Sequence, residues 1–562
     1  MLSSSHRRTL LDVVHSDLSL RSLSRRERLA LAAITLCALL LRAALQHNRV
    51  FWGDEIGTLM YLKKTPTYIL THFDVWLSMN YFILAEKWIA SLCGAADWRL
   101  TLLPLAAAVA IIPLTASLTL KFTGSSRAAL IAASLAAFNP CLLWWSPVIR
   151  AYSLLIAFSL LAINEFFHWH QQRDWRSGVR CAGVVLLLLL THLTGIYVVA
   201  FLIVLLAIEM ASAGWTGGRK FFWQARTLWI PLAGVAIVIS VAYWRMLPGI
   251  VKINREWGTD VPPTSMGYLP QVFVAYVGAG YIAFLSVVLL LAGSWSAVRE
   301  KRALLLLWVA IFLGPILMSL QGVSVNWASY ARYLIFALPL LLILMAEGIE
   351  WLAGHIRMRG GATIAAWSLT LIIVLGWTPS IYWQQFLFKR QWPYARVAKF
   401  LHEHMQKGDV IVAGWAIRFT LGQFFDHPED EILMPDMYVN RVTRLDAPVR
   451  GRVFYVTGLG SFNGRKVPIR RFGGVEVTIY SGATPRALLN EWRDDLLNRT
   501  AGRVYAPFQG DYELLALIEE RLPSGQSTDH WRSLAERCLA QSPAARDVPR
   551  HLEKTTRSVK FP

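Results

Sequence analysis

Long apolar segments dominate the first two thirds of the chain, with polar residues concentrated between them. A helix needs about 20 mostly apolar residues to cross a bilayer. Segments near this length lie at 29–46, 100–120, 128–145, 150–168, 179–193, 194–210, 227–247, 275–297, 303–320, 333–352 and 362–381. The pattern predicts a polytopic α-helical membrane protein of about 11 transmembrane helices over residues 29–381, behind a basic arm at 1–28. The short segments 179–193 and 194–210 permit a second interpretation, one long helix broken near Thr191–Gly195.

Two of the predicted outer loops are long. The first, at 47–99, contains Thr67–His72 and Trp76–Leu92, which are rich in aromatic and aliphatic residues but too short or too polar to span. Trp and Tyr favour the membrane interface, so we expect helices lying on the bilayer surface. The second loop, at 248–274, contains several prolines and aromatic residues. Long ordered loops of this kind often bind ligands or act as lids.

The pattern changes to that of a soluble domain after the last span. Residues 382–483 predict an α/β region and residues 484–562 a helical region. The α/β region contains helices at Trp392–Lys407 and Ala416–Phe425 and strands at Val410–Ala413, Arg452–Thr457 and Val475–Ile479. Helices are expected at Arg486–Leu497, Asp511–Arg521 and Asp529–Ala540.

Composition supports a membrane protein, and the distribution of charge orients it. The chain is 55% hydrophobic and 16% charged, with a mean hydropathy of +0.42, whereas soluble proteins carry about 25% charged residues. The net charge of +20 permits nucleic-acid binding. However, 19 Lys and Arg residues lie in the basic arm and alternate loops, against 11 on the opposite side before residue 382. This asymmetry predicts a cytoplasmic N-terminus and, after an odd number of spans, an outer C-terminus, with no nucleic-acid partner.

Two further features limit the possible classes. The first apolar segment follows an arginine-rich arm and lacks a small-residue cleavage site, so we expect an uncleaved first helix. The five cysteines are scattered without a CxxC pair. This spacing disfavours both a disulfide framework and a thiolate zinc site.

The strongest candidate for chemistry is Asp54-Glu55, in the segment Phe51–Glu55 just after the first helix. Two adjacent carboxylates at a bilayer surface suit a general base with a supporting group, or metal ligands. Loop residues are often charged, so the pair alone is not specific.

Several segments, in their order, resemble the C-type integral-membrane glycosyltransferases. This superfamily includes protein O-mannosyltransferases, lipid A aminoarabinose transferases and a bacterial polyprenyl-phosphate galacturonosyltransferase-like group. The resemblance extends over about residues 25–415 and rests on Asp54-Glu55 after one helix, Arg150-x-Tyr152-x-Leu154, Thr191-His192-x-x-Gly195, Arg332-Tyr333 with Pro339, and the helix and strand at 392–412. One departure is that Trp76–Leu84 lacks the His-Pro-Pro or Asn-Pro-Pro segment of many relatives.

The resemblance implies roles for these residues. Asp54 is expected to be the general base, with Glu55 supporting it. Arg150 and Arg332 are expected to bind the donor phosphate, because a guanidinium donates two parallel hydrogen bonds. Tyr152 and Tyr333 are expected to contact the same phosphate, and His192 to bind substrate. Further candidates for substrate binding, named only because they share the first outer loop, are Lys63, Asp74 and Lys87. The alternatives are structural: arginines and tyrosines are common at helix ends in membranes, and a histidine often serves only in packing.

The expected function is inverting transfer of a sugar from a polyprenyl-phosphate donor to a glycan, glycolipid or protein at the outer face of a bacterial inner membrane. No cofactor is expected. The resemblance implies that no metal is needed, while the sequence itself leaves a divalent metal open. The alternatives are a transporter or flippase of a lipid-linked intermediate and an inactive scaffold of envelope assembly. A transporter places ionisable residues near the membrane midplane. Here Glu165, Glu209, Glu347 and Glu350 are predicted near cytoplasmic helix ends.

The charge asymmetry generates a topology prediction. A reporter fused after Leu497 is expected to be active outside the cytoplasm, and one fused after Gly217 to be active inside it. Reporters that indicate the same side would show that the number of spans is wrong, most simply at Thr191–Gly195.

Overall fold

The computed structural model describes residues 14–15, 17–46, 53–73, 79–93, 97–212, 218, 221–250, 268–320, 331–356, 360–382, 394–425, 431–447, 451–458, 469–472, 475–500, 509–523 and 527–540. The chain divides into two compact units. The membrane unit contains helices α1 to α20, with α2 included from Gly57 onward, and the second unit contains helices α22 to α28 and the sheet. Most of the predicted outer loop 248–274 lies outside the described residues.

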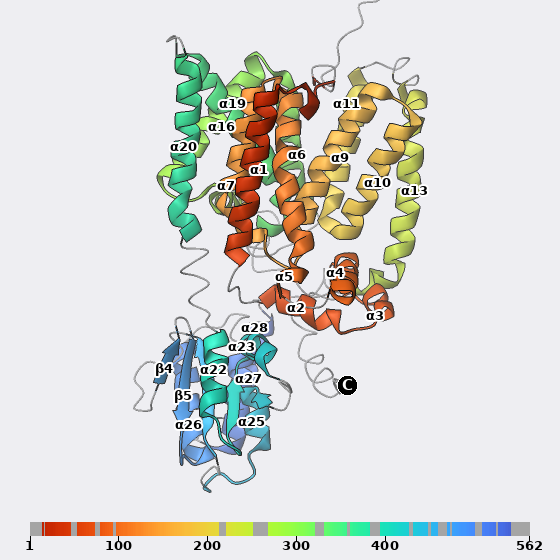
Figure 1. The fold of residues 1–562 in the computed structure, drawn as a ribbon. Coiled ribbons are helices and arrows are strands. Elements are labelled where there is room, and N and C mark those ends of the chain that lie inside the picture. The colour runs from red at the N-terminus through yellow and green to blue at the C-terminus, as the bar shows by residue number, and fades with distance from the viewer. Residues whose placement is uncertain are drawn as a thin grey trace, which may run out of the picture. The chain divides into compact units, whose positions relative to one another are not determined.

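Nine helices within the described ranges are long and apolar enough to cross a membrane, and Figure 1 shows them side by side. They are α1 (Arg25–Gln46), α6 (Leu102–Thr123), α9 (Tyr152–Gln172), α11 (Ile196–Ser212, preceded by η3, Leu193–Gly195), α13 (Arg226–Tyr243, extended by η4, Trp244–Met246), α16 (Tyr281–Arg299), α17 (Leu305–Leu320, preceded by η6, Arg302–Leu304), α19 (Leu338–Gly354, preceded by η7, Ile335–Ala337) and α20 (Gly361–Tyr382). The prediction of a polytopic helical membrane protein is therefore confirmed. The number of 11 crossings stays a prediction.

The other two predicted spans form shorter helices. The segment 128–145, predicted as one helix, divides into α7 (Ser126–Phe138) and α8 (Pro140–Trp145). Pro140 disfavours a helical conformation of the residue before it, and Asn139 accepts a hydrogen bond from the Leu142 N–H at 3.0 Å, which begins a new helix. The segment 179–193 corresponds to α10 (Trp175–Thr191).

Helices α10 and α11 traverse the unit in opposite directions. The His192 ring, between them, lies 5.7 Å from the ring of Tyr152, at the start of α9. Glu209, near the end of α11, pairs with Arg173 at 2.9 Å, beyond the end of α9. The helix break and the end of α11 therefore lie at opposite ends of α9. Two separate helices meet at Thr191–Gly195, as the first interpretation of this segment predicted.

Glycines allow two helices of the membrane unit to cross closely. Helices α16 and α19 pack against each other at Gly293 and Gly348. A Cβ atom on Gly293 would lie 2.1 Å from the Leu344 carbonyl oxygen, and one on Gly348 would lie 2.0 Å from the Leu289 carbonyl oxygen. Without a hydrophobic driving force between helices in lipid, such close backbone packing stabilises the crossing.

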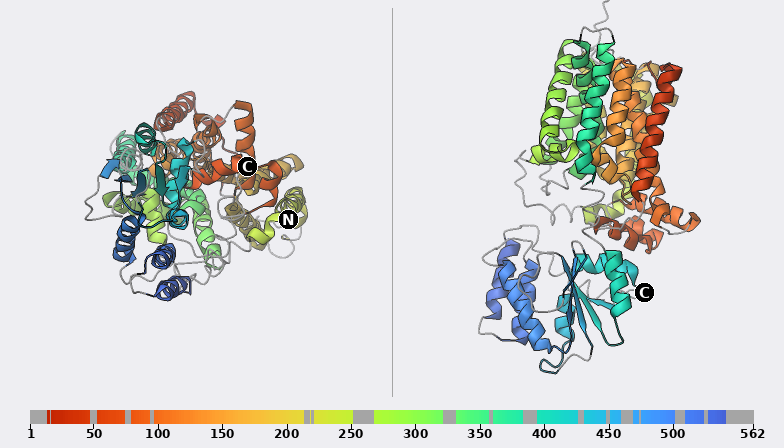
Figure 2. Two further views of the ribbon diagram at one scale, coloured as in Figure 1. Left: turned by 90° about the horizontal axis from the view of Figure 1, so that it is seen from below. Right: turned by 60° about the vertical axis from the view of Figure 1, so that its left-hand side comes forward.

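The second unit contains a five-stranded sheet with helices on both faces, visible in the right-hand view of Figure 2. The strand order is β2-β1-β3-β5-β4, with β1 parallel to β2 and β3, and β5 antiparallel to β3 and β4. The strands are β1 (Val410–Ala413), β2 (Ile432–Leu433), β3 (Val453–Gly458), β4 (Ile469–Phe472) and β5 (Val475–Tyr480). The helices are α22 (Tyr394–His404), α23 (Trp415–Leu421), α25 (Pro435–Arg441), α26 (Pro485–Thr500), α27 (Gln509–Arg521) and α28 (Thr528–Ala540).

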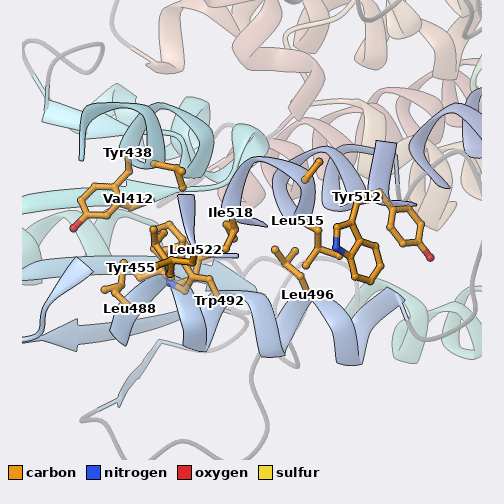
Figure 3. Close-up of a cluster of buried hydrophobic side chains, with 14 of the residues drawn as sticks. Val412, Tyr438, Tyr455, Leu488, Trp492, Leu496, Tyr512, Leu515, Ile518 and Leu522 are labelled. Carbon is orange, nitrogen blue, oxygen red and sulfur yellow. The ribbon is translucent and has the colours of Figure 1, made fainter. Parts of the chain in front are cut away.

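Each face of this sheet has its own apolar core. Alternate residues of β3 point to opposite faces, so Tyr455 packs in one cluster and Phe454 in the other. Helices α25 to α28 cover the first cluster, where the Trp492 ring lies 4.7 Å from the Tyr455 ring (Figure 3). Helices α22 and α23 cover the second cluster.

The predicted elements of this region are present, but three others were missed: β2, α25 and β4. Strand β2 has only two residues, too few to show an alternating pattern. Strand β4 has the sequence Ile-Arg-Arg-Phe. Its two adjacent arginines interrupt the alternation of apolar and polar residues by which a strand is predicted.

Short helices follow α1 within the predicted first outer loop. They are α2 (Gly53–Leu62), α3 (Pro66–Thr71), α4 (Asn80–Cys93) and α5 (Asp97–Leu100). The Asn80 side chain donates to the carbonyl oxygens of Ile69 and His72, which fixes α4 to the end of α3. Trp88 and Leu92 are 67% and 80% exposed, as expected of a helix with an apolar face toward lipid.

Glu86 is an unusual group in α4. Its side chain is fully buried, and both of its carboxylate oxygens lack a hydrogen-bond partner among the described residues. Burial disfavours the ionised form and raises the pKa of Glu86 to about 8. The folded protein therefore keeps this carboxyl protonated at neutral pH.

This burial predicts a specific pH dependence of stability. The unfolded chain ionises Glu86 near pH 4.5, whereas the folded protein does so near pH 8. Folded-state stability therefore falls as the pH rises from about 4 to 8, by on the order of a few kcal/mol. Glu86→Gln removes this dependence, and should raise the thermal midpoint at pH 9 with little change at pH 4. Glu403→Gln, at an exposed carboxylate, is the matched control. Parallel pH profiles for wild type and Glu86→Gln would contradict the assignment.

Candidate functional site

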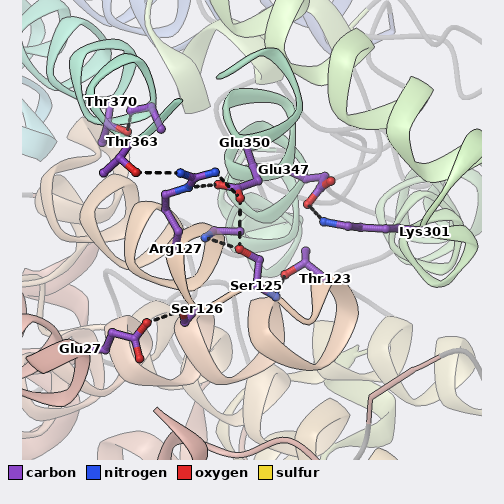
Figure 4. Close-up of polar contacts among 12 residues, drawn as sticks. Glu27, Thr123, Ser125, Ser126, Arg127, Lys301, Glu347, Glu350, Thr363 and Thr370 are labelled. Atoms are coloured by element: carbon purple, nitrogen blue, oxygen red, sulfur yellow. Dashed lines mark hydrogen bonds and ion pairs between the residues drawn. The ribbon is translucent and has the colours of Figure 1, made fainter. Parts of the chain in front are cut away.

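The end of the membrane unit that was predicted to be cytoplasmic contains paired charges. Arg127 forms a bidentate pair with Glu350, with distances of 2.7 and 2.8 Å, and the Lys301 ammonium lies 2.8 Å from Glu347 (Figure 4). Glu209 contacts both Arg173 and His170. These carboxylates neutralise loop cations and fix neighbouring helix ends.

The opposite end contains a turn between α8 and α9 that carries Arg150. The Thr58 hydroxyl of α2 donates to the Ile149 carbonyl oxygen at 3.1 Å and accepts from the Arg150 guanidinium at 3.4 Å. The Ala151 N–H points to the sulfur of Met79 at 3.3 Å. Arg150 is 4% exposed. The turn therefore holds a buried guanidinium beside α2.

Arg42 supports this turn from α1. Its buried guanidinium donates to the carbonyl oxygens of Ala137 at 2.8 Å and Ala136 at 3.3 Å, in the last turn of α7, and to the Ser146 hydroxyl at 2.9 Å. A cation at a helix C-terminus satisfies carbonyl groups that have no partner within the helix. Arg42 therefore connects the end of α7 to the residues that precede Arg150.

Three aromatic rings from distant parts of the chain form a row at this end. The Tyr152 ring lies 4.6 Å from Trp145 and 5.7 Å from His192, and the His192 ring lies 6.0 Å from Tyr333. Each ring belongs to a helix start or a helix break, because Tyr152 opens α9 and His192 separates α10 from η3. The motif residues Tyr152, His192 and Tyr333 are therefore neighbours.

Positive charge gathers around this row. Both Arg150 and Arg332 act electrostatically on His192. The Arg332 guanidinium lies 6.0 Å from the centre of the Tyr333 ring. Helix α9 also begins here, and no side chain caps its N-terminus. Two guanidinium groups and an uncapped helix N-terminus suit a bound anion.

The acidic pair lies on the helix that contacts this turn. Asp54 and Glu55 are in the first turn of α2, and Glu55 precedes Thr58 by three residues, so the Glu55 and Thr58 side chains are near one side of the helix. Glu55 is fully buried. The backbone of Asp54 is helical, but its side chain lies outside what the structure describes.

The weaker candidates are placed elsewhere. Lys87 donates to the Leu62 carbonyl oxygen at 2.7 Å, at the C-terminus of α2, where it satisfies a helix end. Lys63 is exposed just beyond that helix. Asp74 lies outside the described residues. Among the residues that the structure describes, no three His, Cys, Asp or Glu side chains are grouped so as to hold a metal ion.

Sequence reasoning missed Thr58, Arg42 and Met79. Thr58 carried one available signal, since it lies one helical turn after the acidic pair. Arg42 is a lone charge in an apolar segment, which is itself a signal in a membrane helix. Met79 gives no signal, because its contact with Ala151 depends on tertiary structure.

An apolar groove of about 290 Å³ lies between helices of the membrane unit. Helices α16 and α17 form its walls and both pack against α19, and α15 (Leu269–Val277), η7 and α19 also contribute to its lining. Its lining includes Leu334, which directly follows Arg332-Tyr333, and Leu291 and Phe312, which are 65% and 46% exposed. We name it the α16–α17 groove. Its exposed rim belongs to two spanning helices, so it faces lipid.

No protein-family model matches the chain, and no curated protein matches its sequence. The solved structures that are similar to it include the following three. Two are crystal structures of ArnT from Cupriavidus metallidurans, one in the apo state with a TM-score of 0.52 and one bound to undecaprenyl phosphate with a TM-score of 0.51. Each is 11% identical and covers 80% of this chain and 97% of ArnT. The third is the archaeal oligosaccharyltransferase AglB from Archaeoglobus fulgidus, in complex with an inhibitory peptide and a dolichol-phosphate, at a TM-score of 0.45 and 12% identity over 92% of this chain and 86% of AglB.

The likeness to ArnT concerns the fold. ArnT is a C-type integral-membrane glycosyltransferase, from the superfamily that the order of sequence segments indicated. The chain has the fold of the C-type integral-membrane glycosyltransferases, and the predicted resemblance is confirmed at this level.

Proposed function

We propose that the protein is a glycosyltransferase that moves a sugar from a polyprenyl-phosphate donor to an acceptor hydroxyl at the outer membrane surface. The observation that carries this proposal is the convergence of Arg150 and Arg332 on His192, at the end of the bundle where α2 carries Asp54 and Glu55. The fold of ArnT, which binds undecaprenyl phosphate in one of its structures, supports it.

The two arginines provide the site for the donor phosphate. A glycosyl phosphate leaves with the electron pair of the broken C–O bond, so negative charge grows on the departing oxygen. Guanidinium groups stabilise this charge through two parallel hydrogen bonds each. They act without a metal ion in this proposal, because two fixed cations already face the anion.

The α16–α17 groove accommodates part of the polyprenyl chain. Its lining is almost entirely apolar, and Leu334 connects it to Arg332 through the chain itself. A lipid whose phosphate lies at Arg332 has its hydrocarbon directly beside this groove. Burial of apolar surface in the groove then contributes to donor affinity.

Asp54 is the proposed general base, with Glu55 as its supporting group. The Asp54 carboxylate accepts the proton of the acceptor hydroxyl as the hydroxyl oxygen attacks the anomeric carbon. The bond from that carbon to the phosphate oxygen breaks at the same time, and polyprenyl phosphate leaves on the opposite face of the sugar. This single displacement inverts the anomeric configuration.

The outer orientation and the bacterial inner membrane complete the proposal. The 19-to-11 asymmetry of positive charge supports it, because the candidate site lies at the end opposite the paired cytoplasmic-side charges. Acceptors consistent with this location are envelope glycans, glycolipids and exported proteins. Glu209, Glu347 and Glu350 are all paired at helix ends, a pattern that does not fit the midplane carboxylates of a transporter.

Substitution of the acidic pair tests the catalytic assignment. Asp54→Asn keeps the size and hydrogen-bonding capacity of the side chain but removes most of its basicity. Loss of a general base typically slows turnover roughly 10²–10⁴-fold. Purified Asp54→Asn is expected to bind a lipid-linked donor and to transfer sugar slower by this factor, measured with radiolabelled donor in nanodiscs. Glu55→Gln is expected to be less severe.

Glu403→Gln, far along the chain at an exposed helix position, is the control for charge removal. Equal turnover of Asp54→Asn and wild type would eliminate Asp54 as the base, and lost donor binding would make it a binding residue. A wild-type protein without transfer from any polyprenyl-phosphate sugar would overturn the proposed activity.

Substitution of Arg332 separates phosphate binding from a structural role. Arg332→Ala removes both charge and hydrogen bonds, whereas Arg332→Lys keeps the charge but loses the bidentate geometry. Donor KM is expected to rise strongly in Arg332→Ala and to recover only partly in Arg332→Lys. The same pair of substitutions at Arg150 should give the same order. Unchanged kinetics in a folded Arg332→Ala protein would assign Arg332 to the helix end alone.

A further inference from the structure

His192 has a defined tautomer in this structure. The backbone N–H of Thr194 donates to His192 Nδ1 at 3.2 Å, and the Thr194 hydroxyl lies 2.8 Å from the same nitrogen. A backbone N–H is always a donor, so Nδ1 must present its lone pair. The proton of the neutral imidazole is therefore on Nε2. Through this contact His192 caps the short helix η3.

The Nε2–H group is a buried donor without a partner. His192 is 5% exposed, and Nε2 makes no hydrogen bond to any described residue. Leaving a buried donor unsatisfied costs stability, and native proteins rarely do so without a reason. A cationic imidazolium is disfavoured, because burial removes the water that would solvate its charge and because Arg150 and Arg332 add positive charge nearby.

The groups around Nε2–H indicate which kind of ligand can accept its hydrogen bond. The rings of Tyr152 and Tyr333 flank His192, and the two guanidinium groups lie near it. The uncapped N-terminus of α9 adds a further partial positive charge at Tyr152. A ligand that accepts the Nε2–H hydrogen bond beside two cations is best matched by an anion with several oxygens, and phosphate has this geometry.

We propose that His192 binds the phosphate of the lipid-linked substrate through Nε2–H, while Nδ1 remains fixed by Thr194. This inference rests on the proposed function for the identity of the phosphate. In this proposal, His192 adds a neutral hydrogen-bond donor of fixed direction to the two arginines. The same side chain caps a helix and contacts the ligand. The helix break therefore fixes the direction in which the Nε2–H group donates its hydrogen bond.

Two substitutions separate the functions of the two ring nitrogens. His192→Asn keeps a cap, because asparagine is among the best N-cap residues, but its amide is too short to reach the position of Nε2. His192→Gln extends an amide N–H to about the position of Nε2 and weakens the cap. His355→Asn, at an exposed histidine on a different helix end, is the control.

Binding is measured directly in nanodiscs for three probes: a polyprenyl phosphate, the matching polyprenol and inorganic phosphate. Loss of one hydrogen bond to a charged group is expected to weaken polyprenyl phosphate binding by roughly 10-fold or more in His192→Asn. Polyprenol binding should not change, and His192→Gln should bind polyprenyl phosphate more tightly than His192→Asn. The ratio of phosphate to polyprenol affinity within each preparation corrects for any loss of folded protein.

The possible outcomes are distinct. An unchanged ratio in His192→Asn would overturn the role of His192 and leave the arginine site intact. A wild-type protein that binds polyprenol as tightly as polyprenyl phosphate would overturn both this inference and the proposed donor. Tight binding of inorganic phosphate that depends on His192, without a preference for the lipid, would identify free phosphate as the ligand and overturn the lipid assignment.

Discussion

In a membrane, every backbone N–H and C=O group must find a partner inside the protein, because hydrocarbon offers none. This constraint makes each helix break costly and explains where the breaks of this chain occur. Arg42 satisfies the end of α7, Asn139 begins α8, and His192 caps η3. All three compensating side chains are polar, and each brings a polar group to a place where the sequence around it is apolar. In the candidate site, His192 lies at one of these breaks, and Arg150 follows the short helix that begins at another.

The charged side chains are arranged differently at the two ends of the bundle. At one end, Glu347 and Glu350 neutralise Lys301 and Arg127, which fixes helix ends to one another. At the other end, two guanidinium groups act on one neutral histidine. Ion pairs of the first kind neutralise both partners, whereas two cations near one neutral ring favour the binding of an anion. The bundle thus pairs opposite charges at one end and places two cations near one ring at the other.

The sequence was sufficient for the membrane architecture, because run length and hydrophobicity depend only on local composition. It was also sufficient to name Arg150, Tyr152, His192, Arg332 and Tyr333, which the structure brings together. It was insufficient for the division of 128–145, because one proline in an apolar run resembles the tolerated prolines of other spans, such as Pro113 in α6. Arg42 caps the end of α7 by donating to a carbonyl oxygen about 95 residues away, and a local sequence pattern cannot predict such a contact. Strand β2 could not be predicted, because its two residues are a strand only through their pairing with β1.

The position of the α16–α17 groove determines the route by which a lipid chain enters it. Its rim faces lipid, so a hydrocarbon chain enters sideways, by two-dimensional diffusion within the leaflet, without leaving the bilayer. The quantity that determines occupancy is then the mole fraction of the lipid among its neighbours, and its concentration per volume of solution is irrelevant. Ordinary phospholipid acyl chains compete for the same space at enormous excess. Selectivity must therefore come from the head-group end, and the thickness and order of the surrounding membrane become part of the affinity.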